Sequence, residues 1–197
     1  MNDLEMSKEH FQKVSITDIA IEKVPYIKYH GLSEKQCEII QLLAKEVLVI
    51  SKEENDSDEV AITYKMNNDD CKEPDFGVAF GDGHSVEIES DAYSYHLLQS
   101  TEEVVIVILH NHPSPQTLSY DDLSTFILYR NIKMILAVTN QGTIHYIMKH
   151  EGYEFDKARD LMVKYSKPIE EAKTNEVAYE LTIDLLKELK QLGLYYE

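Results

Sequence analysis

Two histidines stand two positions apart in the middle of the chain, and a serine and an aspartate follow them. His110, His112, Ser119 and Asp122 lie within thirteen positions. Neutral imidazole nitrogens and carboxylate oxygens are ordinary ligands of zinc in proteins. Two histidines and one carboxylate leave the fourth position of a tetrahedral ion open to water, as a catalytic site requires. The residue types therefore predict a catalytic zinc site held by His110, His112 and Asp122.

The segment before the histidines predicts how they are aimed. The run Val104 to Leu109 is continuously apolar, which is typical of a strand buried on both faces. In extended backbone, side chains two positions apart point to the same side, so His110 and His112 converge. Pro113 has no backbone N–H and keeps the residue before it extended. A stiff strand end therefore directs both imidazoles toward one point.

The segment after the histidines has the pattern of a helix start. Ser119 is a typical N-cap, and Asp122 at the third helical position can reach back to the N–H of the cap. The alternative interpretation is an ordinary helix start beside two surface histidines, with no metal bound. The two interpretations are compatible, because a carboxylate fixed in a first helical turn is a rigid ligand. One stripe of the expected helix consists of Leu123, Phe126, Ile127 and Arg130.

The same residues resemble the signature of the JAMM (MPN-plus) metalloprotease family, which is His-x-His-Pro, a short spacer and Ser-x-x-Asp. The spacer between Pro113 and Ser119 has five residues, one fewer than in many members. The local string HNHPS is most similar to bacterial branches, including RadC-like and toxin-associated members. The resemblance covers roughly Val60 to Met148 and is specific in the motif.

The resemblance implies both a fold and a chemistry. The fold is an α/β core of the cytidine-deaminase-like or JAMM type, with Zn²⁺ held by His110, His112 and Asp122. The Ser119 hydroxyl would help to stabilise the oxyanion. Members of this family cut peptide or isopeptide bonds, often beside the C-terminal glycine tail of ubiquitin-like proteins. The expected protein is a zinc metallopeptidase or isopeptidase, a hydrolase whose partner is a protein or peptide substrate, including one with a ubiquitin-like tail.

Such a hydrolase also needs a carboxylate outside the ligand set to move the proton of the attacking water. In the resembling family this is a Glu just before a strand, and the matching segment here begins with Asp75. Asp is one methylene shorter than Glu. Glu73 lies on the same side if the backbone is extended there, so Asp75 and Glu73 are the two candidate bases. Glu87, Glu89 or no base at all are the remaining alternatives; a turn explains Asp75 without function, and a solvated strand face explains the other two.

Composition restricts the class of protein. The chain has 197 residues, enough for one domain with an appendage and a substantial core. Its formal net charge of −17 repels phosphate backbones, so no nucleic-acid partner is expected. Cys37 and Cys71 are too few for a disulfide framework. We expect no membrane span, because no apolar run approaches about 18 residues, and a cytoplasmic location, because no signal segment opens the chain.

Periodicity predicts the elements around the motif. Ser33 and Gln36 form a capping box for a helix that continues to about Ile50, and residues 52–59 form an acidic loop that we interpret as solvated linker. The other expected elements are a strand at 60–66, a hairpin of 76–80 with 85–88, a helix at 91–99, a hairpin of 134–139 with 143–148, and helices at 155–165 and 175–192. His145, inside one of these strands, is expected to be a packing residue.

These elements predict an α/β fold class, a mixed β-sheet flanked by helices with a C-terminal helical pair. The predicted division is an N-terminal helical segment and acidic loop (1–59), a JAMM-like catalytic core (60–150) and a C-terminal helical appendage (151–197). The helical pair would cover the open face or edge of the sheet. Its alternative role is dimerisation or docking of a partner, and a homodimer is the form that dimerisation would take.

Two alternatives to a peptidase follow from the same residues. The Asp75-for-Glu difference favours a zinc-binding but catalytically silent JAMM-like interaction module. The helical segment from Tyr153 to Glu197 favours a RadC-like accessory protein or toxin-system component, whose partner defines its role.

Overall fold

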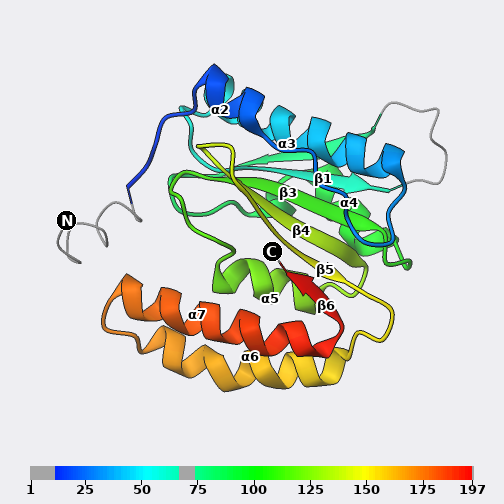
Figure 1. Ribbon diagram of the computed structural model, residues 1–197, viewed down its shortest axis with the longest axis vertical. Helices are drawn as coiled ribbons and strands as arrows, with labels where there is room; N and C mark the ends of the chain where they lie inside the picture. The colour runs from blue at the N-terminus through cyan, green and yellow to red at the C-terminus, as the bar shows by residue number, and fades with distance from the viewer. Residues whose placement is uncertain (1–11, 67–73, 197) are drawn as a thin grey trace.

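A six-stranded mixed β-sheet forms the middle layer of the molecule, with strand order β2-β1-β3-β4-β5-β6 (Figure 1). The computed structural model describes residues 12–66 and 74–196. Strands β3 and β4 pair in parallel, and the other four pairings of this sheet are antiparallel. The strands are β1 (Val60–Lys65), β2 (Phe76–Phe80), β3 (Ile106–His112), β4 (Ile132–Thr139), β5 (Ile144–Lys149) and β6 (Leu194–Tyr196).

Helices cover both faces of the sheet, which confirms the predicted α/β fold class (Figure 1). Helices α2 (Asp18–Lys23) and α3 (Glu34–Glu54) lie on one face. The opposite face carries α4 (Ala92–Ser100), α5 (Tyr120–Leu128), α6 (Phe155–Glu170) and α7 (Asn175–Leu189). Two apolar cores result, one on each side of the sheet. None of the helices within the described ranges combines the length and apolarity that a membrane crossing needs.

Strand β3 is the centre of the sheet, and all seven of its residues are buried. Val107 and Leu109 belong to the core beneath α3, whereas Ile106 and Ile108 belong to the core beneath α5 and α7. Because side chains alternate along a strand, the next even-numbered residues also face α5. The alternation therefore places His110 and His112 in the layer between the sheet and the second set of helices.

Both predicted helix starts are confirmed. Ser33 accepts a hydrogen bond from the Gln36 N–H, and the Gln36 side chain accepts one from the Ser33 N–H. Ser119 and Asp122 form the same reciprocal capping box at the start of α5. These motifs were predictable because every partner lies within three residues of the other.

Two local predictions were wrong. Strand β2 does not form a hairpin with residues 85–88; it pairs with β1, and the chain enters a short 3₁₀-turn at Ile88–Ser90. The Asp82 carboxylate accepts hydrogen bonds from the His84 and Ser85 N–H groups, so this segment curls onto itself instead of extending. Helix α6 runs through Pro168 to Glu170, and so ends later than predicted.

The C-terminal segment is a cover for the second face of the sheet. Ala158 and Met162 of α6 and Leu185 of α7 are buried in the core that also contains Phe126 of α5. After α7 the chain turns at Gly193, whose φ of 79° is left-handed, and β6 pairs with β5 at the sheet edge. The segment thus shares its core with the helix that carries Asp122. The predicted division of the chain at 59 and 150 stays a prediction.

A substitution in this shared core tests whether the C-terminal helices fold with the rest. Leu185 is fully buried, so Leu185→Ala should lower the free energy of unfolding by about 2–5 kcal/mol in one transition. Urea unfolding followed by circular dichroism measures this. Leu128 is 67% exposed on α5, and the matched control Leu128→Ala should change stability by less than about 0.5 kcal/mol. A separate early transition that alone responds to Leu185→Ala would show an independent C-terminal unit.

Candidate metal centre

The side chains of His110, His112 and Asp122 converge on one point, as the sequence predicted. One ligand atom from each lies within 4.8 Å of the others. The Nε2 atoms of the two histidines are 2.8 Å apart, and the Asp122 carboxylate oxygens lie 3.1 Å from His110 Nε2 and 3.5 Å from His112 Nε2. Ligands bound about 2.0–2.1 Å from a tetrahedral ion are roughly 3.3 Å from one another, so these separations suit a single metal ion.

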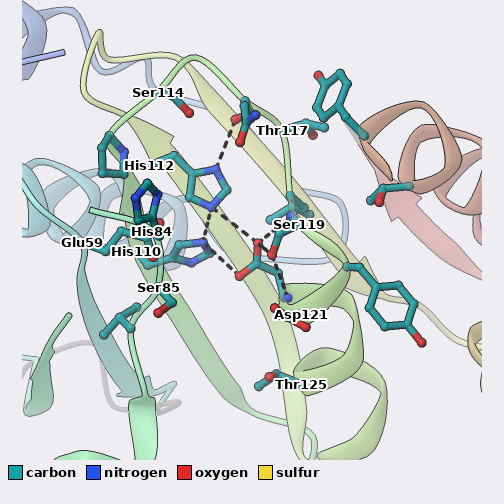
Figure 2. A pocket seen from close by; sticks show the side chains of 18 of the residues that line it. Glu59, His84, Ser85, His110, His112, Ser114, Thr117, Ser119, Asp121 and Thr125 are labelled. Carbon is teal, nitrogen blue, oxygen red and sulfur yellow. Dashed lines mark hydrogen bonds and ion pairs between the residues drawn. The ribbon is translucent and has the colours of Figure 1, made fainter. Parts of the chain in front are cut away.

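Neighbouring groups hold two of the three candidate ligands in place (Figure 2). Asp122 Oδ2 accepts hydrogen bonds from the Ser119 N–H at 2.6 Å and from the Ser119 hydroxyl at 2.7 Å. The second ring nitrogen of His112 lies 3.2 Å from the Gln116 carbonyl oxygen. An N–H on that nitrogen leaves the lone pair on Nε2 directed at the shared point. The capping box therefore starts α5 and also orients a carboxylate oxygen that could bind a metal ion.

Charge pairing within this group is strong because the group is buried. His110 and His112 are 3% and 6% exposed. Burial alone would raise the pKa of Asp122, but the charges and hydrogen bonds of the two histidines hold that pKa well below its usual value. Burial opposes the charged form of His112, yet the Asp122 hydrogen bond and charge raise the pKa of His112 to about 9. The surroundings thus stabilise the ionised Asp122 carboxylate and the protonated His112 imidazole that faces it.

A further carboxylate, which the sequence analysis did not select, lines the same cavity. Glu59 lies immediately before β1, and the antiparallel register pairs Ala61 with His110. Continuing this register by two residues places Glu59 opposite His112 on the same face of the sheet. Its side chain is 8% exposed, and burial raises its pKa against the opposing charges of His112 and His110. Figure 2 shows it beside the imidazoles.

The cavity around this group has a volume of about 390 Å³ and extends away from the sheet toward α7. One wall is the segment from Pro113 to Ser119, and another includes His84, Ser85 and Val86. A stripe of α7 lines the far side, and its members are Asn175, Ala178, Tyr179 and Thr182. The C-terminal segment also braces the loop between the ligands, since the hydroxyls of Thr117 and Tyr196 are 3.1 Å apart. The C-terminal helices are thus part of the site.

The predicted catalytic residues have different positions. The Ser119 hydroxyl lines the cavity but donates its one proton to Asp122, so here it orients a ligand; its predicted role at an oxyanion stays a prediction. The structure does not bring Asp75 to the site. Asp75 is exposed and accepts a hydrogen bond of 2.8 Å from the Tyr93 hydroxyl. It precedes the β2 residue that pairs with Tyr64, so it lies opposite the far end of β1 from Glu59, on the order of 20 Å away along the strand.

Glu87 and Glu89, two other candidates for the base, are not among the residues that line the cavity. Glu73 lies outside the described residues. Glu87 and Glu89 are exposed, and Glu89 accepts a hydrogen bond from the Tyr129 hydroxyl. Their predicted exposure is confirmed, although the segment is not a strand. His145 lies half-buried on β5 and is not a member of the ligand group found in the described residues.

Glu59 was missed because it was counted with the acidic loop. Residues 52–59 contain five acidic side chains, which favours solvated linker, but Ser57 and Glu59 are buried. A local signal was present, since Glu59-Val60-Ala61 is a carboxylate before an apolar and a small residue, the pattern that selected Asp75. The sequence did not show which of the two strands lies next to the histidine strand.

Comparison with known proteins adds no family assignment. No protein-family model, no curated protein and no solved structure matches the chain. The resemblance to the JAMM family therefore remains a prediction that depends on the motif residues. What the geometry supports directly is that His110, His112 and Asp122 could bind a metal ion.

Removing one ligand should abolish metal binding. We expect the purified protein to bind about one zinc ion per chain, and His110→Ala to retain less than about a tenth of it, because two remaining ligands hold zinc poorly. Metal analysis after dialysis measures this. His145→Ala is the matched control, since His145 is a half-buried histidine of β5, which is separated from β3 by β4. Equal zinc content in the His110 variant and the wild type would rule out this site.

Zinc binding should strengthen as pH rises. The pKa of His112 is raised to about 9 in the metal-free protein, so at neutral pH the imidazole carries a proton that zinc must displace. Displacement of one proton makes the apparent affinity rise roughly tenfold per pH unit from about pH 7 to pH 9 and level off above. Competition with a chromogenic chelator of known pH dependence measures it. An affinity that does not change over this range would contradict the pairing of His112 with Asp122.

Proposed function

We propose that the protein is a zinc-dependent hydrolase of amide bonds, a metallopeptidase or isopeptidase. The observation that carries the proposal is the convergence of His110, His112 and Asp122 within 4.8 Å, with the buried carboxylate of Glu59 lining the same cavity. Three ligands alone would suit a structural or regulatory ion as well. A separate carboxylate beside them supplies the group that hydrolysis needs in addition.

Zinc is the metal that best suits this donor set. Two imidazole nitrogens and one carboxylate are borderline ligands, typical of three-ligand catalytic zinc sites, whereas magnesium and calcium prefer oxygen ligands alone. When bound, the ion would polarise a carbonyl group and lower the pKa of a water molecule. His110 and His112 would hold it from the sheet, and Asp122 from the helix. Ser119 and the Gln116 carbonyl keep two of these ligands in the required orientation.

Glu59 is the residue that we assign as the general base. It is outside the ligand set, lines the cavity and lies opposite His112 in the extended register of β1 and β3. A carboxylate there can accept a proton from the attacking water and return it to the leaving amine. This assignment replaces Asp75, which is exposed and bound to Tyr93 at the opposite end of β1.

The cavity walls suit a peptide-like substrate. Apolar side chains such as Val86 and Leu118 alternate with groups that can form hydrogen bonds, such as Ser114, Gln116 and Asn175. A volume of about 390 Å³ accommodates a few residues of an extended peptide. A ubiquitin-like tail, which the motif resemblance implies, belongs to this class of substrate.

The alternatives make different predictions for the same site. A silent interaction module would bind zinc and cleave nothing, and its main support was the Asp75-for-Glu difference, which Glu59 removes. A RadC-like accessory role was suggested by the C-terminal helices. Those helices are partly committed to the core and to the cavity wall, which leaves less of their surface for a partner.

Neutralising Glu59 should separate catalysis from metal binding. In the zinc-loaded protein, Glu59→Gln should lower the cleavage rate by about 10²–10⁴-fold while the zinc content stays at the wild-type level. Fluorescence-quenched peptide libraries and isopeptide-linked peptides, each with and without a zinc chelator, are the assay. Asp75→Asn, the same change at the other candidate base, should leave the rate unchanged.

The reverse result, with Asp75→Asn inactive and Glu59→Gln active, would identify Asp75 as the general base, as the sequence analysis suggested. Zinc-loaded wild type that cleaves none of the substrates would favour the silent interaction module. Cleavage that persists after the chelator has removed the zinc would contradict the proposal itself.

A further inference from the structure

Asn111 stands between the two histidine ligands but on the opposite face of β3. Its side chain is fully buried. Because side chains alternate along the strand, it points away from the cavity and toward the loop that precedes β1. A buried amide in this place must satisfy a carbonyl oxygen and an NH₂ group, and any partner is therefore part of the local structure.

The bonds of Asn111 enclose Glu59 on both sides. The Val60 N–H donates to Asn111 Oδ1 at 2.8 Å, and Asn111 Nδ2 donates to the Asp58 carbonyl oxygen at 3.1 Å. These are the peptide groups immediately after and immediately before Glu59. An ionised aspartate has no donor and a leucine has neither group, whereas the asparagine amide offers an acceptor oxygen and an N–H donor on two separate atoms.

The Asn111 amide also links the segment around Glu59 to α3 and to the end of β4. Asn111 Nδ2 also lies 3.1 Å from Ser51 Oγ and 2.8 Å from Asn140 Oδ1. The Asn140 N–H in turn donates to the His112 carbonyl oxygen at 2.9 Å. The ends of α3, β3 and β4 thus meet at one buried side chain.

We propose that Asn111 is the positioning residue that sets the Glu59 carboxylate against the His110, His112 and Asp122 group. The inference rests on the proposed function, in which Glu59 is the base. Strand β1 begins at Val60, so Glu59 lies just outside it. Its own N–H and carbonyl bond to Asp82 and Gly81, and Asn111 holds the same two peptide groups from the other side. A single strand residue, one position from each of the two histidines, thereby ties the base to the metal-ligand group. A displacement of about 1 Å at such a group is enough to lose most of its effect.

A double-mutant cycle on zinc affinity tests this without requiring cleavage. Removing the negative charge of Glu59 near the cation should weaken zinc binding by about three- to tenfold in the Glu59→Gln protein. If Asn111 positions that charge, the same Glu59→Gln change should have an effect below about twofold in the Asn111→Ser background. Chelator competition on the four purified proteins measures the affinities.

Asn140→Ser is the matched control. Asn140 is also a buried asparagine of this network, 1% exposed. It accepts one of the hydrogen bonds of Asn111 and bonds the Val14 and Ser57 carbonyl oxygens, but it bonds neither peptide group beside Glu59, and the two bonds from Asn111 to those groups do not involve it. The full effect of Glu59→Gln should therefore persist in the Asn140→Ser background. A general structural role of the network would reduce the Glu59 effect in both backgrounds.

Three outcomes decide the proposal. An undiminished effect of Glu59→Gln in the Asn111→Ser background overturns it, and so does an equal reduction in the Asn140→Ser background. A selective reduction supports it even in a protein that cleaves no substrate, in which case the hydrolase proposal fails while the positioning role stands.

A second measurement needs no variant at position 111. In the wild type, the Val60 amide should exchange its hydrogen with solvent as slowly as the Ile62 amide inside β1, because Asn111 Oδ1 accepts it. Rapid exchange at Val60 alone would overturn the proposed support of Glu59.

Discussion

The site depends on the burial of β3 on both faces. A strand with no solvent-facing side must send alternate side chains into two separate layers, and the order of residues along it decides which layer receives which group. His110 and His112 enter the layer beneath α5, whereas Asn111 enters the layer beneath α3. The same backbone therefore presents two metal ligands to one side and a structural amide to the other. A shift of one residue in register would exchange these roles.

Burial of so many polar groups at one strand end needs compensation. An unpaired buried charge is strongly unfavourable, and here the charges are arranged as partners: Asp122 lies against both imidazoles and also accepts two hydrogen bonds from Ser119. Glu59 is the member whose burial is least compensated, and its raised pKa records this. Buried titratable groups with shifted pKa values are common in active sites. This burial is the physical basis on which we propose a catalytic role for the site.

Prediction from the sequence succeeded where the partners are close along the chain. The His110 and His112 alignment follows from alternation, and the Ser119–Asp122 capping box follows from helix geometry over three residues. It failed where pairing is distant. The residues 85–88 resemble a strand by alternation, but the Asp82 turn and the pairing of β2 with β1 decide otherwise. Glu59 and Asp75 both precede a short strand, and only the order of strands in the sheet distinguishes them.

The amino-acid sequence by itself determined the ligand types, their common face on β3 and the rigid start of α5, because these depend on periods of two and 3.6 residues that any strand or helix obeys. The tertiary structure alone decided which carboxylate joins the ligands and that α7 forms the far wall of the cavity. Those choices depend on which strand pairs with β3 and in what register, through contacts such as the bond between Val60 and Asn111, 51 residues apart. Such contacts arise from the packing of the whole chain, so no local pattern contains them.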